Sequence, residues 1–295
     1  MKVALAGTGR MGTAMGLRLI EQGHELRVWN RSPDRARELV ASGAAQASSA
    51  AELAAGADVV ITMVTDAAAM RAIYGGAEGL LSGADTTLFI EMSTVRPGDH
   101  VALEAEVRAA GAALVECPVG GTVAPARKGK LIGFAGGQDA DLDRAAPVLD
   151  DLCRRMARCG PVGQGAAMKL AANLPLILYW ESLGEALVLC SDSPLSPPDL
   201  VELLADTSGA AAVLKARSDI VSKALDGEAV PGTFDLRQMR KDLGLMHDEA
   251  VGRGRALPML EAAIASLDSA IAAGLGDQDG AALSAARRRG TLDQG

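Results

Sequence analysis

The sequence predicts an α/β protein: an N-terminal, doubly wound parallel sheet followed by an all-α C-terminal domain. The first half of the chain alternates short apolar runs with segments of helical period, which is typical of a parallel sheet covered by helices. A glycine-rich turn directly follows the first apolar run. After residue 160 the strand pattern disappears, and the remaining segments are helical in period. A chain of 295 residues is long enough for two domains.

Six short runs in the first half are rich in Val, Ile or Leu and apolar on both faces, as expected of strands buried between helices. We expect strands at residues 2–6, 25–29, 58–64, 86–92, 113–117 and 131–135. Segments of helical period separate them, and we expect helices at residues 11–22, 33–42, 50–55 and 97–110. Repeated strand and helix units of this kind favour the doubly wound arrangement.

The second half is predicted to be helical throughout, with helices at residues 164–190, 199–205, 236–250, 257–273 and 281–289. We therefore place one domain at residues 1–162 and an all-helical domain for substrate binding and dimerisation at residues 163–295, beginning with a long interdomain helix. Residues 174–180 of that helix read Leu-Pro-Leu-Ile-Leu-Tyr-Trp and are apolar on every face. Such a helix is buried all round, and a small helical domain often completes that burial with a second subunit. We expect a homodimer or a tetramer.

Composition excludes several classes of partner. Lys and Arg number 29 and Asp and Glu number 37, so the formal net charge is −8 and repels phosphate backbones and anionic membranes. The four cysteines form no C-x-x-C pair, and the three histidines lie far apart, so no metal site is expected. No apolar run approaches the roughly 18 residues that a membrane helix requires. We expect a cytoplasmic protein that binds neither nucleic acid nor membranes.

The strongest local signal is the segment Gly7-Thr8-Gly9-Arg10-Met11-Gly12, which has the pattern G-x-G-x-x-G. It follows a predicted strand and opens a predicted helix, which is the context of a Rossmann dinucleotide site. The first glycine permits a tight turn, the second lets the backbone approach a pyrophosphate, and the third permits close helix packing. The anion is expected at the helix N-terminus, where N–H groups and the helix dipole favour negative charge.

The end of the second predicted strand indicates which dinucleotide binds. An acidic residue there would accept a hydrogen bond from the ribose of NAD, but this chain reads Asn30-Arg31-Ser32. Arg31 is suited to pair with a 2′-phosphate and to stack on adenine, while Asn30 and Ser32 supply neutral hydrogen bonds. The sequence therefore predicts a preference for NADP(H), with NAD(H) possible.

Four motifs, in order, resemble those of the β-hydroxyacid dehydrogenase family of the 3-hydroxyisobutyrate dehydrogenase type. Besides the glycine motif, they are Glu91-Met92-Ser93-Thr94-Val95-Arg96-Pro97, Pro118-Val119-Gly120-Gly121 running on to Gly129-Lys130-Leu131, and Gly160-x-x-Gly163-x-Gly165-x-x-x-Lys169-x-x-x-Asn173. A C-terminal signature, Phe234 leading to Lys241-Asp242, follows. The resemblance covers nearly the whole chain. The Asn-Arg-Ser segment and the Pro125-Ala126-x-x-Gly129 spacing are most similar to the glyoxylate and succinic semialdehyde reductase branch.

The resemblance implies a role for each residue of these motifs. Lys169 is implied to be catalytic, and Thr94 to lie between nicotinamide and substrate. The substrate is implied to contact Thr94, Gly120, Gly121, Thr122 and Asn173. The cofactor is implied to contact Gly7, Thr8, Gly9, Arg10, Met11, Gly12, Asn30, Arg31, Ser32, Val64, Thr94 and Lys241.

The residues around Lys169 support that role independently. Lys169 and Asn173 are four residues apart, so on a helix they project from one face and can hold one small oxyanion or carbonyl. The residues beside Lys169 are apolar, and a lysine in a desolvated pocket has its pKa lowered toward the working range of a proton donor. Two departures from the family pattern are Gly120, where much of the family has Ser, and Pro175, which is expected to kink the helix.

These observations predict an NADP(H)-dependent enzyme, a dehydrogenase or reductase acting on CH–OH groups. It would interconvert a small 3-hydroxy acid, or a related hydroxy acid, and its semialdehyde or keto form, so the partner is a small carboxylate or aldehyde. One alternative is an imine reductase of the same fold, in which the lysine is typically replaced. Another is a catalytically silent NADPH-binding protein.

Overall fold

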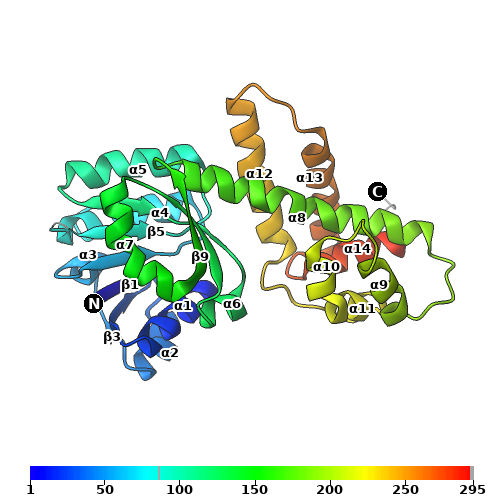
Figure 1. The fold of residues 1–295 in the computed structure, drawn as a ribbon, viewed down its shortest axis with the longest axis horizontal. Helices are drawn as coiled ribbons and strands as arrows, with labels where there is room; N and C mark the ends of the chain where they lie inside the picture. Colours follow the sequence, from blue (N-terminus) through cyan, green and yellow to red (C-terminus); the bar gives the residue numbers. More distant parts are fainter. Residues whose placement is uncertain (86, 293–295) are drawn as a thin grey trace. The chain divides into compact units, whose positions relative to one another are not determined.

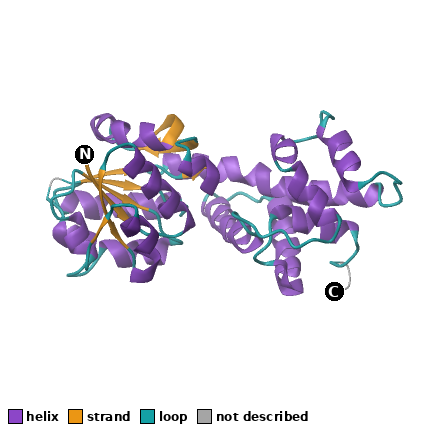
Figure 2. Cartoon of the chain, turned by 90° about the horizontal axis from the view of Figure 1, so that it is seen from below, coloured by secondary structure: helices purple, strands orange, loops and turns teal. Residues whose placement is uncertain are grey.

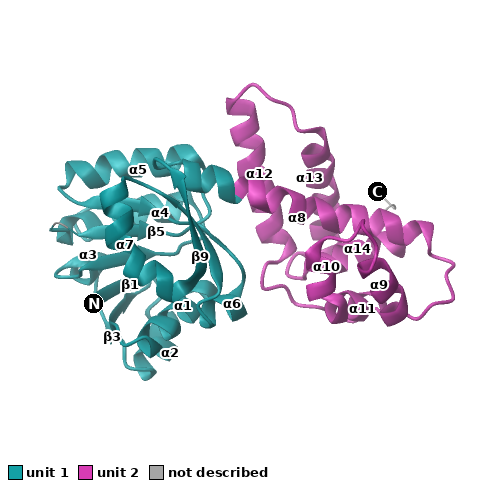
Figure 3. Cartoon of the chain, viewed as in Figure 1, with its two compact units in different colours: residues 1–169 teal, residues 170–295 magenta. Residues whose placement is uncertain are grey.

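The computed structural model describes residues 1–85 and 87–292, and its chain forms two compact units (Figure 3). Unit 1 is Met1–Lys169 and unit 2 is Leu170–Gly295. The division falls inside the long helix α8 (Gln164–Leu189), a few residues beyond the boundary expected after residue 162.

Unit 1 is built on one nine-stranded sheet of order β3-β2-β1-β4-β5-β6-β8-β7, with β9 paired to β8 (Figure 1). The first six strands run parallel to one another. Their bounds are β1 (Lys2–Ala6), β2 (Glu25–Trp29), β3 (Ala45–Gln46), β4 (Val59–Thr62), β5 (Leu88–Glu91) and β6 (Ala113–Glu116). The expected start of β5 at residue 86 lies outside the described residues.

One edge of the sheet departs from the all-parallel prediction. Strand β8 (Leu131–Gly136) runs antiparallel to β6 and to the two-residue β7 (Val119–Gly120), and parallel to β9 (Cys153–Gly160). Ten residues, 121–130, separate β7 from β8, which is fewer than the dozen or more that a parallel crossover needs. The parallel Rossmann core is confirmed, and its last three strands form a mixed edge.

Helices cover both faces of this sheet (Figure 2). Ile61 and Ile90 pack into one core cluster with α1 and α7, and the adjacent Val60 and Phe89 pack into another with α3, α4 and α5. This alternation is what the two-residue period of a strand buried on both faces predicts. The helices are α1 (Arg10–Glu21), the 3₁₀ turn Pro33–Ala36, α2 (Arg37–Ala41), α3 (Ala50–Ala54), α4 (Ala67–Tyr74), the 3₁₀ turn Leu80–Gly83, α5 (Pro97–Ala109), α6 (Val123–Arg127) and α7 (Asp139–Leu152).

Unit 2 is helical, as predicted. After α8 come α9 (Pro197–Ala205), α10 (Ala212–Ala216), α11 (Ser218–Leu225), α12 (Leu236–Gly252), α13 (Pro258–Ala270), the π-helical turn Ile271–Leu275 and α14 (Gly280–Arg288). Trp180 of α8 is fully buried, and a Cβ on Gly280 would lie 2.3 Å from its ring, so α14 can approach α8 only through a glycine. Pro175 lies inside α8 without ending it.

One segment corrects the expectation that no run is long and apolar enough to cross a membrane. Residues Pro258–Leu275 form 18 helical residues with a mean hydropathy of 1.2, which meets that test by length and composition. The same segment buries Leu260, Leu267 and Ala270 in the core of unit 2. Over the whole segment 22% is buried within the chain, and the test rests on length and composition only.

A buried carboxylate joins β6 to the start of α8. Oε1 of Glu116 accepts hydrogen bonds from the N–H groups of Gly163 (2.6 Å) and Gly165 (2.7 Å). Nε2 of the buried His100 lies 3.7 Å from Oε2. Burial raises the pKa of Glu116 to about 7, although the N–H groups of α8 oppose the shift. Burial also lowers the pKa of His100 to about 4, so its ring is neutral near pH 7.

The raised pKa of Glu116 predicts a specific pH dependence of stability. This pKa is about 7 in the folded chain against an ordinary value of 4.5, so the contribution of Glu116 to stability is complete below pH 4.5 and is lost as the pH rises through 7. Glu116→Gln removes this titration. The stability of the variant relative to wild type should therefore increase with pH, by up to ~3 kcal/mol above about pH 7. Urea unfolding of both proteins at several pH values measures this difference, and a constant difference would contradict the raised pKa.

Candidate active site

The turn between β1 and α1 requires glycine at two positions. Gly7 has φ = +97°, and a Cβ there would lie 2.2 Å from the carbonyl oxygen of Met63. A Cβ on Gly12 would lie 1.9 Å from the carbonyl oxygen of Gly7, so only glycine lets α1 begin this close to β1. At Gly9, in contrast, a Cβ would meet no atom within 4 Å. The middle glycine thus leaves open space beside the backbone, as a bound pyrophosphate requires.

The N-terminus of α1 fits an anion. Gly9 is its N-cap, and in the described part of the chain no side chain caps this end and no acidic residue lies in the first turn. The first N–H groups of a helix have no partner within the helix, and the helix dipole favours negative charge beside them. The donor set of Gly9, Arg10, Met11 and Gly12 therefore suits the pyrophosphate of a dinucleotide.

Asn30 organises the cofactor end of β2 through its own side chain. Its Oδ1 accepts from the N–H of Thr8 (3.1 Å), and its Nδ2 donates to the carbonyl oxygen of Ser32 (3.0 Å). Sequence reasoning placed Asn30 against the cofactor; here it holds the glycine loop and the following turn together. Arg31 and Ser32 are exposed. The next carboxylate along the chain, Asp34, pairs with Arg37 at 2.6 Å.

A buried network fixes the loops after β4 and β5. The N–H of Val64 donates to Oγ of Ser93 (2.8 Å), and the N–H of Ser93 donates to Oε1 of Glu91 (2.8 Å). Oε2 of Glu91 accepts from the hydroxyl of Thr62. Burial raises the pKa of Glu91, and the hydrogen bonds from Ser93 and Thr62 oppose the shift. The network holds Val64 in place, and also Thr94, which directly follows Ser93. Both are predicted to contact the cofactor.

The loop implied to bind substrate is a second glycine turn. Gly121 has φ = +125°, and a Cβ there would lie 2.8 Å from a methyl group of Leu131. Thr122 is the N-cap residue of α6. At Gly120 a Cβ would be 3.5 Å from the ring of Phe134, an ordinary contact, so the fold has room for a side chain at that position. The glycine at 120 is thus not required by packing.

Lys169 is 7% exposed and Asn173 is 6% exposed, and both lie on α8. Their four-residue spacing places them on one face of the helix, about one turn apart. The helix is apolar around them, with Leu170 buried. A lysine and an amide on one face can donate to a single oxygen atom of a small molecule.

Asp242 links Asn173 and Lys241 within unit 2. The Nδ2 of Asn173 donates to Oδ2 of Asp242 (2.9 Å), and Nζ of Lys241 lies 3.2 Å from Oδ1 of the same carboxylate. Asp242 is 3% exposed. Asp242 belongs to the C-terminal sequence signature, but the sequence alone indicates no role for it. Its position beside a predicted site lysine was the available signal.

The predicted residues therefore fall into two sets. Unit 1 contains Lys169 and the loops that follow the carboxyl ends of its parallel strands, and unit 2 contains Asn173 and Lys241, joined by Asp242. Ligand sites of open α/β sheets lie at the carboxyl ends of the strands. Among the described residues no group of three or more His, Cys, Asp or Glu side chains could hold a metal ion.

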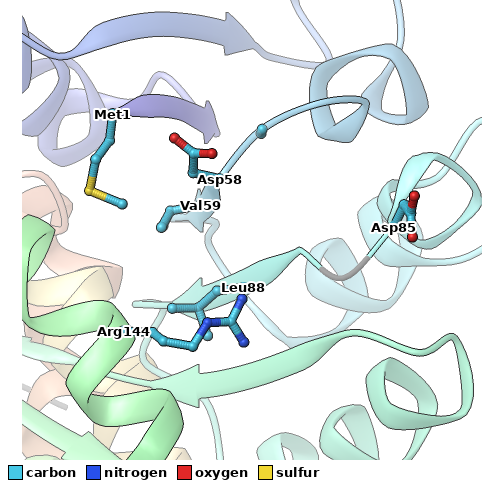
Figure 4. Close-up of a pocket in the computed structure, with 7 residues that line it drawn as sticks. Met1, Asp58, Val59, Asp85, Leu88 and Arg144 are labelled. Atoms are coloured by element: carbon cyan, nitrogen blue, oxygen red, sulfur yellow. The ribbon is translucent and has the colours of Figure 1, made fainter.

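A hollow of about 360 Å³ lies elsewhere in unit 1 (Figure 4). Val59 and Leu88, which begin β4 and β5, line it together with Asp58, Asp85 and Arg144. It is therefore at the amino ends of the parallel strands, opposite the loops described above. No predicted site residue lines this hollow.

Known proteins match the chain over both units. Residues 2–160 match the NAD-binding domain of 6-phosphogluconate dehydrogenase, and residues 163–286 match the NAD-binding domain of NADP-dependent 3-hydroxyisobutyrate dehydrogenase. The 3-sulfolactaldehyde reductase of Escherichia coli K12 is 33% identical over 95% of this chain and 94% of that protein. Glyoxylate/succinic semialdehyde reductase 1 of Arabidopsis thaliana is 31% identical over 95% of this chain and 96% of that protein.

A solved structure agrees with these matches. The Mycobacterium tuberculosis 3-hydroxyisobutyrate dehydrogenase with L-serine superposes with a TM-score of 0.86 at 30% identity, over 96% of this chain and 97% of that one. Matches of this extent, together with the glycine loop and the two-unit architecture, show the family. The chain belongs to the β-hydroxyacid dehydrogenase family of nicotinamide-dependent oxidoreductases.

Proposed function

We propose that this protein is a cytoplasmic, NADP(H)-dependent oxidoreductase that interconverts a small 3-hydroxy acid, or a related hydroxy acid, and its semialdehyde or keto form. The observation that carries the proposal is the buried Lys169 on the same helical face as Asn173, in a chain whose glycine loop fits a dinucleotide. Lys169 is the general acid and base, and Asn173 holds the same substrate oxygen.

The chemistry follows from the charge that develops on the substrate. When bound, the nicotinamide supplies a hydride in reduction and accepts one in oxidation. Reduction of a carbonyl puts negative charge on its oxygen, and the Nζ of Lys169 both stabilises that charge and donates a proton to it. In oxidation the same nitrogen takes the proton from the hydroxyl. Asp242 accepts from the amide of Asn173 and so orients that amide.

The substrate class is a small anionic aldehyde or hydroxy acid. The names of the relatives include 3-sulfolactaldehyde, glyoxylate, succinic semialdehyde and 3-hydroxyisobutyrate, all of which are small molecules with an acidic group. The loop of Gly120 and Gly121 offers backbone N–H groups, and Thr122 offers a hydroxyl, to such a group. Gly120 itself contributes no side-chain hydroxyl.

Two other functions fit the residues of the chain less well. An imine reductase shares the fold, but Lys169 occupies the position at which those enzymes typically lack lysine. In a silent NADPH-binding protein, a buried lysine on the same helical face as an amide would have no function. Steady-state assays with short semialdehydes, hydroxy acids and cyclic imines, each with both cofactors, separate the three functions.

Lys169→Ala should lower the turnover number of reduction by about 10² to 10⁴-fold, the usual contribution of general acid catalysis, while NADPH still binds. Lys169→Arg should restore little, because guanidinium keeps its proton at any working pH. Stopped-flow and steady-state rates measure turnover, and quenching of NADPH fluorescence measures binding. Lys215→Ala, at an exposed lysine paired with Asp206, is the matched control and should leave turnover unchanged. Turnover retained in Lys169→Ala would remove the lysine from the mechanism.

Arg31→Ala tests the cofactor preference. Loss of one charged hydrogen-bond partner costs ~1.5 to 3 kcal/mol, so the variant should bind NADPH about tenfold to a hundredfold more weakly. NADH binding should hardly change, since NADH carries no 2′-phosphate. The neighbouring exposed Arg35 provides the control substitution, Arg35→Ala. Equal affinity of the wild type for NADH and NADPH, by fluorescence titration, would contradict the proposed preference.

We also propose that the protein is a homodimer or tetramer and binds neither nucleic acid nor membranes. Apolar side chains of α8 remain uncovered in the single chain, including Leu189, which is 91% exposed, and Met168. A second subunit would remove this surface from water. Light scattering at micromolar concentration should give at least twice the 30.1 kDa of one chain, and a monomer mass would contradict the proposal.

A further inference from the structure

We propose that Glu116 is a positioning residue for catalysis, which fixes the first turn of α8 and through it the location of Lys169. This inference rests on the proposed catalytic role of Lys169. Glu116 does not lie among the residues that the family motifs assign to substrate or cofactor. Its side chain is fully buried at the end of β6.

The contacts of Glu116 are made with the backbone at the start of the helix. Helix α8 begins at Gln164, and Oε1 accepts from the N–H groups on both sides of it, Gly163 at 2.6 Å and Gly165 at 2.7 Å. The first N–H groups of a helix have no intrahelical acceptor, so a side-chain oxygen that accepts two of them holds the turn in place. Lys169 follows Gly165 by four residues, which is about one turn of helix.

Glycines surround the carboxylate and make the close approach possible. A Cβ on Gly136 would lie 2.4 Å from Oε1 of Glu116. A Cβ on Gly165 would lie 2.2 Å from the carbonyl oxygen of Phe134 and 3.1 Å from Oε1. Gly163 has φ = +100°, which favours glycine. The pattern Gly163-x-Gly165 ahead of Lys169 thus has a physical reason: it brings α8 onto β8 with the carboxylate between them.

The same residue connects the helix to the substrate loop. Glu116 ends β6, and the chain continues through Cys117 into β7, which contains Gly120. The N–H of Cys117 donates to the carbonyl oxygen of Glu91 (2.7 Å), so this stretch is anchored to the neighbouring strand. A single side chain thereby sets the start of α8 relative to the strand that leads into the loop.

The titratable groups around Glu116 do not supply a compensating cation near neutral pH. From α5, His100 faces it with a pKa lowered to about 4 by burial, and the charge of Glu104 raises the pKa of Glu116 further. Burial is the main cause that raises the pKa of Cys117, the next residue along the chain, and of Cys159 in β9, and the charge of Glu116 raises both further. The N–H groups at the start of α8 lower the pKa of Glu116 and therefore stabilise its charged form.

The test compares two substitutions of Glu116. Glu116→Ala removes the acceptor and should lower the turnover number about tenfold to a hundredfold, since small displacements of a catalytic group have effects of that size. Binding of NADPH should change by less than about twofold, because the glycine loop of α1 is untouched. Glu116→Gln retains an oxygen acceptor of the same reach and should recover turnover to within about threefold of wild type. Loss of turnover in both variants alike would overturn the role of the acceptor oxygen.

Hydrogen exchange gives a second measurement that does not depend on activity. In the intact protein with NADPH, amides of residues 160–169 should exchange at least about tenfold faster in Glu116→Ala than in wild type or Glu116→Gln. If Lys169→Ala loses turnover while Glu116→Ala keeps both turnover and slow exchange, the inference is wrong. If Glu116→Ala speeds exchange but Lys169→Ala keeps turnover, the proposed function fails instead.

Glu181→Ala is the matched control for general loss of stability. Glu181 lies on the same helix, its pKa is raised by burial, and it accepts from the hydroxyl of Ser266 (2.9 Å). This variant should be destabilised in urea without loss of turnover at temperatures where it is folded. An equal loss of turnover in Glu181→Ala would overturn a specific role for Glu116. If Glu116→Ala does not fold, Glu116→Asp, whose carboxylate is one methylene shorter, should fold with reduced turnover, and unchanged turnover would contradict the proposal.

Discussion

The parallel register of the central strands is the constraint on which the rest of the site depends. Ala6, Thr62, Glu91 and Glu116 pair with one another in sequence across β1, β4, β5 and β6, so these four strands end at one level of the sheet. The loops that follow must therefore begin side by side. The glycine turn, the Val64 loop, the Ser93-Thr94 loop and the Gly120-Gly121 loop come from segments far apart in the sequence. The register alone brings them to one edge.

Two neighbouring strand ends carry buried carboxylates, which is costly unless each is hydrogen-bonded. Glu91 and Glu116 are register partners, and their side chains point to the face covered by α4 and α5. Glu91 accepts from the N–H of Ser93, and Oε1 of Glu116 accepts from N–H groups at the start of α8. Among the described residues, the buried Oε2 of Glu116 has no hydrogen-bond partner. Burial raises both pKa values, and the hydrogen bonds limit the rise. Breaking these hydrogen bonds would leave a buried carboxylate without donors, which is costly. The two acids therefore hold in place the Ser93 loop and the start of α8.

Much of this arrangement could be predicted from the sequence, because it depends on local pattern. The bounds of β1 and β2 are confirmed, as are the glycine turn and the long helix α8. Strand β9 was missed because its sequence, Cys-Arg-Arg-Met-Ala-Arg-Cys-Gly, is charged and partly exposed, so only pairing with β8 reveals it. The contacts of Glu116 and Asp242 could not be predicted because their partners lie 47 and 69 residues away. Sequence alone shows an acid at the end of a strand and cannot show which N–H group it meets.

Helix α8 contains both residues proposed to act on the substrate. Lys169 is the last residue of unit 1, and Asn173 follows it by four residues in unit 2. Neither side chain depends on a flexible loop for its position. The buried carboxylates Glu116 and Asp242 act on the two sides of this segment, the first on the backbone before Lys169 and the second on the amide of Asn173. Hydrogen bonds to buried acids, rather than flexible loops, thus fix the backbone before Lys169 and the amide of Asn173, which is what the proposed proton transfer from Lys169 requires.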